Sequence, residues 1–161
     1  MELSFHWESC LKMDSVRQLY LILPTIRSRF GIWCCDLSDL GDEENIATRL
    51  GAEAIDLSRS YMQSLDPSST FLSLNEDKLI DLISDISDQK GKTKVLIYNL
   101  DLLLSKLGPN QIKNFWNVLL GGLVYKKRAL VFMVPKTASQ LIPQNEDYKN
   151  WVNNQRIIHN F

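Results

Sequence analysis

The sequence contains no apolar run as long as the roughly 18 residues that a transmembrane helix requires, so we expect no membrane contact. Its first residues, MELSFHWESCLKMD, lack a basic segment followed by an apolar core, and we expect no signal peptide. Charge of one sign is not in excess either, since 18 Lys and Arg stand against 19 Asp and Glu. This balance argues against a strongly basic nucleic-acid-binding domain, although it leaves room for local basic patches.

Cysteine and histidine are scarce. The three cysteines, Cys10, Cys34 and Cys35, are an odd number that includes an adjacent pair, which is not a disulfide framework. Neighbouring residues of a strand point to opposite faces, so Cys34 and Cys35 are interpreted as small buried residues rather than metal ligands. The two histidines lie near opposite ends of the chain. We therefore expect no zinc site and a reducing, cytoplasmic compartment.

The sequence does contain an alternation of helical patterns and short apolar runs. Helical patterns cover residues 14–28, 44–51, 58–66, 75–89 and 110–120, and strand-like runs cover residues 30–35, 52–58, 94–100 and 128–134, with a further extended segment at 156–161. Continuous apolar strands between helices indicate a parallel sheet covered on both faces. We expect one α/β domain over residues 1–161, with a three-layer parallel sheet of about four to five strands.

Several residues mark the expected ends of these elements. Asp14 or Ser15 is expected to cap the first helix, and Pro24 is expected to shorten it. Asn75 is the expected N-cap of the helix at 75–89, and Gly51 is the expected C-cap of the helix at 44–51. Pro135 should end the strand at 128–134, and the tail after it is polar.

The triplet Gly91-Lys92-Thr93 matches the end of a phosphate-binding loop, G-x-x-x-x-G-K-[ST]. The first glycine of that motif would fall on Ile86, and the triplet follows a helix and precedes a strand. A phosphate loop has the opposite order, because the helix N-terminus after the loop must meet the phosphates. We therefore interpret Gly91-Lys92-Thr93 as a turn between a helix and a strand.

The expected topology places a true phosphate loop after the first strand, in DLSDLGDEE at residues 36–44. This segment has one glycine, no lysine and five acids: Asp36, Asp39, Asp42, Glu43 and Glu44. Such acids would repel a triphosphate, and acids in a first helical turn are also ordinary complements of the helix dipole. With either interpretation, the segment is not expected to hold ATP.

The strand KVLIYNLDLLL has the apolar half of the pattern that ends in a magnesium-binding aspartate in ATPases. Tyr98 stands at the metal-ligand position, and a phenol cannot replace a carboxylate there. Asn99 and Asp101 are the polar residues that remain, and Asp101 is also explained as a cap or a solvent-facing acid. We expect no catalytic residue, no metal ligand and no cofactor.

Three stretches, RLGAEAIDLS (49–58), VLIYNLDLLL (95–104) and RALVFMVP (128–135), occur in the order seen in small P-loop NTPase-like proteins. With Glu146-Asp147-Tyr148 in the tail, they resemble the small P-loop subunit, BrxF, of bacteriophage-exclusion (BREX) defence systems. The resemblance spans about residues 14–150 and implies a RecA/AAA-like P-loop NTPase core. It also implies work beside a DNA methyltransferase, a large ATPase and a phosphatase-like protein.

Two departures from that family concern nucleotide ligands. The loop lysine and threonine have no counterpart in residues 36–44, and the magnesium aspartate corresponds to Tyr98. The hypothesis is therefore a degenerate, non-catalytic scaffold or adaptor of an antiphage defence complex, acting through contacts with other subunits. Two alternatives stay open: an ATPase subunit with an unconventional or partner-completed site, and a DNA-binding accessory module.

Two groups of residues are candidate contacts with a partner or with DNA. The cluster Lys126-Lys127-Arg128 would suit a phosphate backbone or an acidic partner, although such clusters also form solvated loops. Trp7 and Trp151 lie in weakly patterned ends of the chain, where exposed aromatic side chains would suit an interface. Packing of both termini onto the core is the alternative for the tryptophans.

Overall fold

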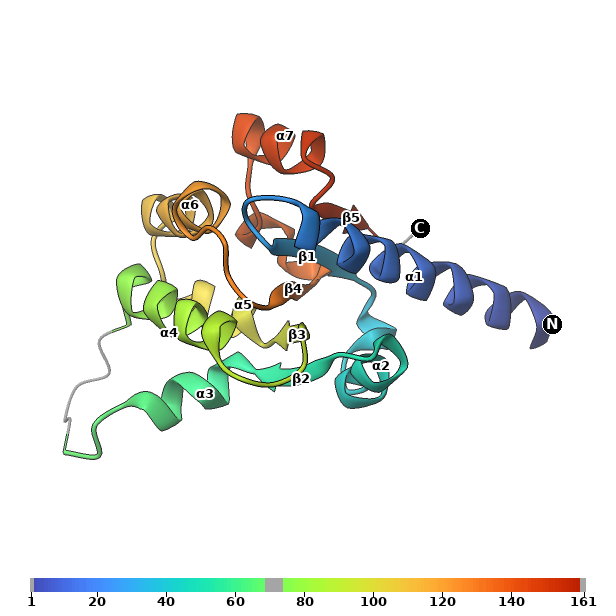
Figure 1. The fold of residues 1–161 in the computed structure, drawn as a ribbon, viewed down its shortest axis with the longest axis horizontal. Helices are drawn as coiled ribbons and strands as arrows, with labels where there is room; N and C mark the ends of the chain where they lie inside the picture. Colours follow the sequence, from blue (N-terminus) through green and yellow to red (C-terminus); the bar gives the residue numbers. More distant parts are fainter. Residues whose placement is uncertain (1, 69–73, 160–161) are drawn as a thin grey trace.

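The computed structural model describes residues 2–68 and 74–159, with side chains described from residue 12 onward. Five parallel strands form one sheet in the order β2-β3-β4-β1-β5, with helices on both sides (Figure 1). This confirms the expected α/β class, the parallel sheet and the cover on both faces. None of the helices in the described ranges is long and apolar enough to cross a membrane.

The strands are β1 (Phe30–Cys35), β2 (Glu53–Asp56), β3 (Lys94–Tyr98), β4 (Ala129–Pro135) and β5 (Ile157–His159). The α-helices are α1 (Glu2–Ile22), α2 (Glu43–Leu50), α3 (Leu57–Ser64), α4 (Glu76–Asp88), α5 (Leu100–Leu104), α6 (Pro109–Asn117) and α7 (Asn145–Asn153). Short 3-10 turns follow α1, β1 and β4, and a π-helical turn, Val118–Gly122, extends α6.

The core lies on both faces of the two central strands. Every residue of β1 and β4 is buried, which explains why both read as continuous apolar runs. Cys34 packs with the helices α3 to α7 on one face, whereas Cys35 packs with α1 and α2 on the other. The two thiols thus point to opposite faces and are buried, as expected.

The first helix is longer than the sequence indicates. It begins at Glu2 and passes through Asp14 and Ser15, so the expected caps are wrong. Asp14 instead accepts a hydrogen bond from Arg17 Nη1 at 2.9 Å. The helix continues because Met13 and Val16, on either side of the cap signal, both pack against the sheet. Pro24 does shorten the helix, which ends at Ile22 before a 3-10 turn.

Strand ends also differ from expectation. The strand expected at 94–100 ends at Tyr98, because Asn99 takes a left-handed conformation (φ 61°) and Leu100 begins α5. Pro135 belongs to β4 and pairs in register with Cys35, rather than ending the strand before it. The helix α7 in the polar tail was not expected.

Other boundary signals are confirmed. Gly51 ends α2 in the left-handed conformation (φ 68°), which a glycine adopts without steric cost. The Asn75 side chain caps α4 by accepting a hydrogen bond from the Lys78 backbone N–H at 2.9 Å. The last extended segment forms the edge strand β5, paired with β1.

Candidate functional site

The carboxyl end of β1 is where a parallel α/β sheet of this kind would present a phosphate loop. The chain leaves β1 at Asp36, makes a 3-10 turn over Leu37–Asp39 and enters α2 at Glu43. The Asp36 carboxylate accepts ion-pair hydrogen bonds from Lys12 Nζ at 2.5 Å and from Lys136 Nζ at 2.6 Å. These two lysines lower the pKa of Asp36 to about 2.

The Asp36 ion pairs change the electrostatics of this position. Lys12 comes from α1 and Lys136 follows β4, so three separate elements meet at the end of β1. Both ammonium groups are satisfied by a carboxylate of the chain itself. A phosphate at this position would have to compete with Asp36 for the same two donors.

The helix that follows begins with acids. Glu43 and Glu44 occupy the first turn of α2, and Asp42 is its N-cap residue. Glu43 Oε1 accepts a hydrogen bond from the backbone N–H of Gly41 at 3.0 Å, so this donor is already occupied. These carboxylates complement the helix dipole and repel an anionic ligand.

The end of β3 holds the residues expected as remnants of a magnesium site. Tyr98 is the last residue of β3 and pairs in register with Asp56 of β2. Burial first, and then the charges of Asp56 and the α2 acids, raise the pKa of Tyr98, so its phenol stays neutral and offers no anionic ligand. Asn99 turns the chain, and Asp101 lies two residues further on, within α5. Asp101 is thus a partly buried helix residue with a pKa raised by burial, rather than a strand-end ligand.

Among the residues that the structure describes, neither a metal cluster nor an activated thiol is found at this edge of the sheet. Within residues 2–68 and 74–159, no three His, Cys, Asp or Glu side chains come together as metal ligands. Burial raises the pKa of Cys34 to about 11 and that of Cys35 to about 12. Both thiols are therefore protonated at neutral pH and are poor nucleophiles.

The residues expected as partner or DNA contacts have different roles. Lys127 is exposed, whereas Lys126 bonds Asp88 and Ser84 at 2.8 Å each. Arg128 is only 2% exposed, and Trp151 is fully buried, with its ring centroid 5.5 Å from that of Trp116. Arg128 and Trp151 are thus not surface contacts, because each is part of the packing of the domain.

The side chain of Trp7 lies outside those that the structure describes, so its expected role as a contact is neither supported nor opposed.

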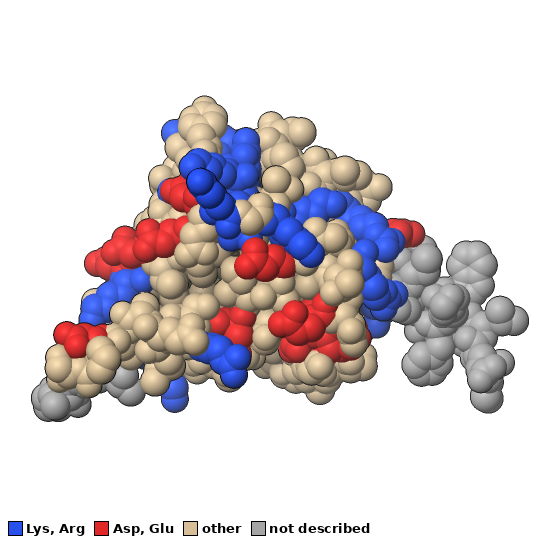
Figure 2. Space-filling view, turned by 60° about the horizontal axis from the view of Figure 1, so that its bottom comes forward, with Lys and Arg blue, Asp and Glu red and all other residues tan. Residues whose placement is uncertain are grey.

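Charge is divided between the two edges of the sheet. The segments that lead into the strands (27–30, 49–53, 88–94, 125–129 and 154–157) hold ten of the 18 basic residues: Arg27, Arg29, Arg49, Lys90, Lys92, Lys94, Lys126, Lys127, Arg128 and Arg156. The same segments hold two acids, Glu53 and Asp88. The segments after the strands carry seven acids, Asp36, Asp39, Asp42, Glu43, Glu44, Asp56 and Asp101, and two basic residues, Arg59 and Lys136. Figure 2 shows one face on which Lys and Arg gather along the upper part, with Asp and Glu mainly below them.

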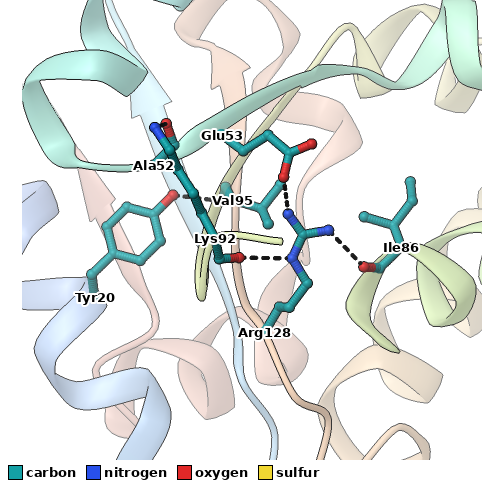
Figure 3. A network of polar contacts seen from close by, with 7 residues as sticks. All are labelled: Tyr20, Ala52, Glu53, Ile86, Lys92, Val95 and Arg128. Carbon is teal, nitrogen blue, oxygen red and sulfur yellow. Dashed lines mark hydrogen bonds and ion pairs between the residues drawn. The ribbon is translucent and has the colours of Figure 1, made fainter. Parts of the chain in front are cut away.

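Gly91-Lys92-Thr93 has a structural role in the turn between α4 and β3 (Figure 3). The Lys92 carbonyl accepts a hydrogen bond from Arg128 Nε at 2.8 Å, and the Ile86 carbonyl accepts one from Arg128 Nη1 at 3.1 Å. Glu53 forms an ion pair with the same guanidinium. Gly91 has a φ of 154°, and a Cβ there would lie 3.1 Å from the Glu53 carboxylate and 3.2 Å from Arg128. The glycine therefore makes room for the ion pair, not for a phosphate.

Two features of the carboxyl edge were not anticipated from the sequence. One is the pairing of Asp36 with Lys12, which is 24 positions away and on another element. The other is a set of exposed leucines: Leu37 (59% exposed) and Leu40 (42%) after β1, and Leu102 (51%) after β3. Two leucines between the acids of residues 36–44 were a visible signal, since a solvated acidic loop does not need them.

A cavity lies elsewhere, between α6 and the segment that leads into α7. Its volume is about 570 Å³, and its walls are mostly apolar, with Leu107, Ile112, Trp116, Leu141 and Ile142 among them. None of the residues that line it comes from residues 36–44 or from the end of β3. The cavity therefore does not complete a nucleotide site of the expected kind.

Comparison with known proteins found no protein-family model, curated protein or solved structure that matches this chain.

Proposed function

We propose that this chain is a non-catalytic, P-loop-like scaffold or adaptor subunit of a prokaryotic antiphage defence complex, working through protein–protein contacts. The observation that carries the proposal is the ion-paired state of Asp36, where a nucleotide-binding relative would place its phosphate loop. Lys12 and Lys136 are satisfied by Asp36, and the helix that follows begins with acids. The position thus has the geometry of a loop between β1 and α2 without the chemistry to hold a triphosphate.

The strand order supports the RecA/AAA-like part of this proposal. In such cores, the loop strand and the metal-ligand strand stand on either side of one further strand. Here β1 and β3 stand on either side of β4 in an all-parallel sheet. Tyr98 at the end of β3 is then the residue that replaces the metal-binding aspartate.

The exposed leucines support a role in contacts with other proteins. Leu37 and Leu40 lie between β1 and α2, and Leu102 lies in α5 directly after β3, so all three belong to the carboxyl edge of the sheet. Apolar side chains gathered at a site that has lost its ligand chemistry suit a partner surface. Their partner would be another subunit of the complex.

A nucleotide titration tests the loss of ligand binding. We expect no binding of Mg·ATP or Mg·ADP by the isolated protein in the micromolar range, measured by calorimetry and by the shift of the melting temperature. Micromolar binding by the isolated protein would overturn the proposal. Binding that occurs only when the protein is assembled with its partners would favour the alternative of an ATPase site completed by another subunit.

Co-purification tests the adaptor role. The products of the genes beside the one for this chain are co-expressed with it, with a methyltransferase, a large ATPase and a phosphatase-like protein as the expected set. We expect a stable complex that the double variant Leu37→Asp, Leu40→Asp no longer joins. Val152→Asp, at an exposed position of α7, is the matched control and should still assemble. A complex that forms equally well with both variants would rule out the carboxyl edge as the contact.

A further inference from the structure

Three basic segments that are far apart in the sequence meet at the amino edge of the sheet. Arg27 and Arg29 precede β1, Lys90 and Lys92 precede β3, and the segment at 125–128 precedes β4. These strands are neighbours in the order β3-β4-β1. With adjacent strands about 4.8 Å apart, the three segments lie side by side over about 10 Å.

Hydrogen bonds hold the three segments in place. The backbone N–H of Tyr125 donates to the Arg27 carbonyl at 2.9 Å, and Arg29 Nη1 donates to the Lys126 carbonyl at 2.5 Å. On the other side, Arg128 Nε donates to the Lys92 carbonyl at 2.8 Å. The surface is therefore fixed before any ligand arrives, which lowers the entropic cost of binding.

The positive charge of this edge is not cancelled locally. Its two acids are already engaged, Glu53 with Arg128 and Asp88 with Lys126. Arg27, Lys90 and Lys127 are exposed, and no ion pair within the described part of the chain involves them. A polyanion would thus meet three unneutralised cations on one surface.

Tyr125 lies among these cations and is 75% exposed, more than any other large apolar side chain that the structure describes. Its backbone is in the left-handed conformation (φ 56°), fixed by the bond to Arg27. An exposed aromatic ring between cations fits an unpaired nucleic-acid base, whose face is free for stacking. A duplex hides the faces of its bases, and an acidic protein surface offers no comparable stacking partner.

We propose that the amino edge of the sheet binds single-stranded nucleic acid. Tyr125 stacks on a base, and Arg27, Lys90 and Lys127 contact successive phosphates, with Lys92 at the margin. Arg128 and Lys126 hold the surface in place and do not contact phosphates, because each already forms an ion pair within the domain. This binding surface lies on the edge opposite to the leucines of the proposed adaptor contact and does not depend on that contact.

Fluorescence anisotropy with labelled oligonucleotides of about 15 residues, one of deoxyuridine and one of uridine, tests this proposal. We expect binding at low salt. The logarithm of the association constant should fall linearly with the logarithm of the salt concentration, with a slope of about −2, as for three neutralised phosphates of a single strand. The variant Arg27→Ala, Lys90→Ala, Lys127→Ala should bind at least about tenfold more weakly. The two oligonucleotides differ at the sugar 2′ position, so a preference for either identifies the natural ligand and supports the proposal.

The tyrosine is tested separately from the charges. Tyr125→Ala should weaken binding by about tenfold, whereas Tyr125→Phe should retain it, because stacking needs the ring and not the hydroxyl. The matched control, Lys106→Ala, Lys113→Ala, Lys149→Ala, removes the same charge from exposed positions elsewhere and should change binding by less than about twofold. Unchanged near-ultraviolet circular dichroism establishes that each variant is folded.

Three outcomes would overturn the proposal. The first is an absence of binding at low salt. The second is a full loss with the triple charge variant but no effect of Tyr125→Ala, which would indicate a general polyanion or an acidic protein as the ligand. The third is competition by unlabelled duplex as effective as that by the single strand.

Discussion

The residue that defines the carboxyl end of β1 is Asp36, the first residue after that strand. Lys12 and Lys136 reach it from two different elements, and the amino groups of both form ion pairs with its carboxylate. In a phosphate loop, a lysine is left without an internal partner so that it can bind the ligand. Here two lysines have an internal partner, and their positive charge contributes to the stability of the domain.

This stability should depend on pH. The pKa of Asp36 is about 2 in the folded protein against 3.8 for a free aspartate, so the unfolded state binds the proton more readily. The contribution of the Asp36 ion pairs to the free energy of unfolding is therefore complete above pH 3.8 and is lost as the pH falls towards 2. We expect Asp36→Asn to lower the free energy of unfolding at pH 7 by about 1 kcal/mol, since solvent partly screens the pair.

Urea denaturation at a series of pH values measures the effect. The difference between wild type and Asp36→Asn should shrink as the pH falls from 4 towards 2, because the Asp36 carboxylate becomes protonated as the pH approaches its folded pKa of about 2. Asp81→Asn, an exposed residue of α4, is the control and should remain within about 0.5 kcal/mol of wild type. A difference that stays constant through this pH range would mean that the ion pairs do not stabilise the fold.

At the scale of elements, Arg128 connects four parts of the chain. Its buried guanidinium binds the end of α4 through Ile86, the following turn through Lys92 and the start of β2 through Glu53, while its own backbone leads into β4. Five donors in a rigid plane suit this arrangement, which a lysine could not reproduce. The neighbouring Lys127 is exposed and makes no ion pair with any described residue.

Adjacent residues of the same charge should therefore differ sharply when they are replaced. Arg128→Ala should lower the free energy of unfolding by about 3 kcal/mol, because two carbonyls and a carboxylate lose their donor. Lys127→Ala should change it by less than about 0.5 kcal/mol. Chemical denaturation of both variants, followed by tryptophan fluorescence, makes the comparison, and equal effects would contradict the structural role of Arg128.

The sequence predicted some elements well, and the reasons are local. The strands β1 and β4, α4 with its Asn75 cap and the end of α2 at Gly51 each combine a periodic pattern with a boundary residue. The short helix α5 was missed because its residues LDLLL continue the apolar run of β3, and only the left-handed Asn99 separates the two. Such a change of direction is decided by packing, which a run of apolar letters does not show.

The candidate site shows the same limit. The acidic character of residues 36–44 could be read from the sequence, because carboxylates are visible there. The partners of Asp36 could not be predicted, since Lys12 and Lys136 reach it only through the packing of α1 and the order of the strands. The interpretation of Lys126-Lys127-Arg128 as one cluster failed for a related reason. One of these three side chains is buried, one is paired and one is exposed.

At the scale of the whole molecule, the strand β4 holds the sheet together. It lies between β1 and β3 in the sheet, and its Phe132 packs against the rings of Phe30 and Trp116, with centroids 6.1 and 5.7 Å away. Without β4, the two halves of the sheet, β2-β3 and β1-β5, would share no hydrogen bonds. The edge strand β5 pairs with β1 alone, so its removal should destabilise the domain less than the removal of β4.

Two truncated chains test this difference. A chain that ends at residue 125 lacks β4, and we expect it to have no near-ultraviolet circular dichroism and no cooperative thermal transition. A chain that ends at residue 154 lacks only β5, and we expect it to remain folded with a lower melting temperature. A cooperative transition in the shorter chain would show that β4 is not essential to the sheet.

The central place of β4 also affects how the protein is made. Phe30 of β1 is paired with Leu130, so the first strand to leave the ribosome must wait for about a hundred further residues before its main neighbour exists. During that time, the apolar run FGIWCC stays unpaired and prone to associate with other nascent chains. Synthesis of this domain should therefore depend on chaperones that shield an early strand until a late one is translated.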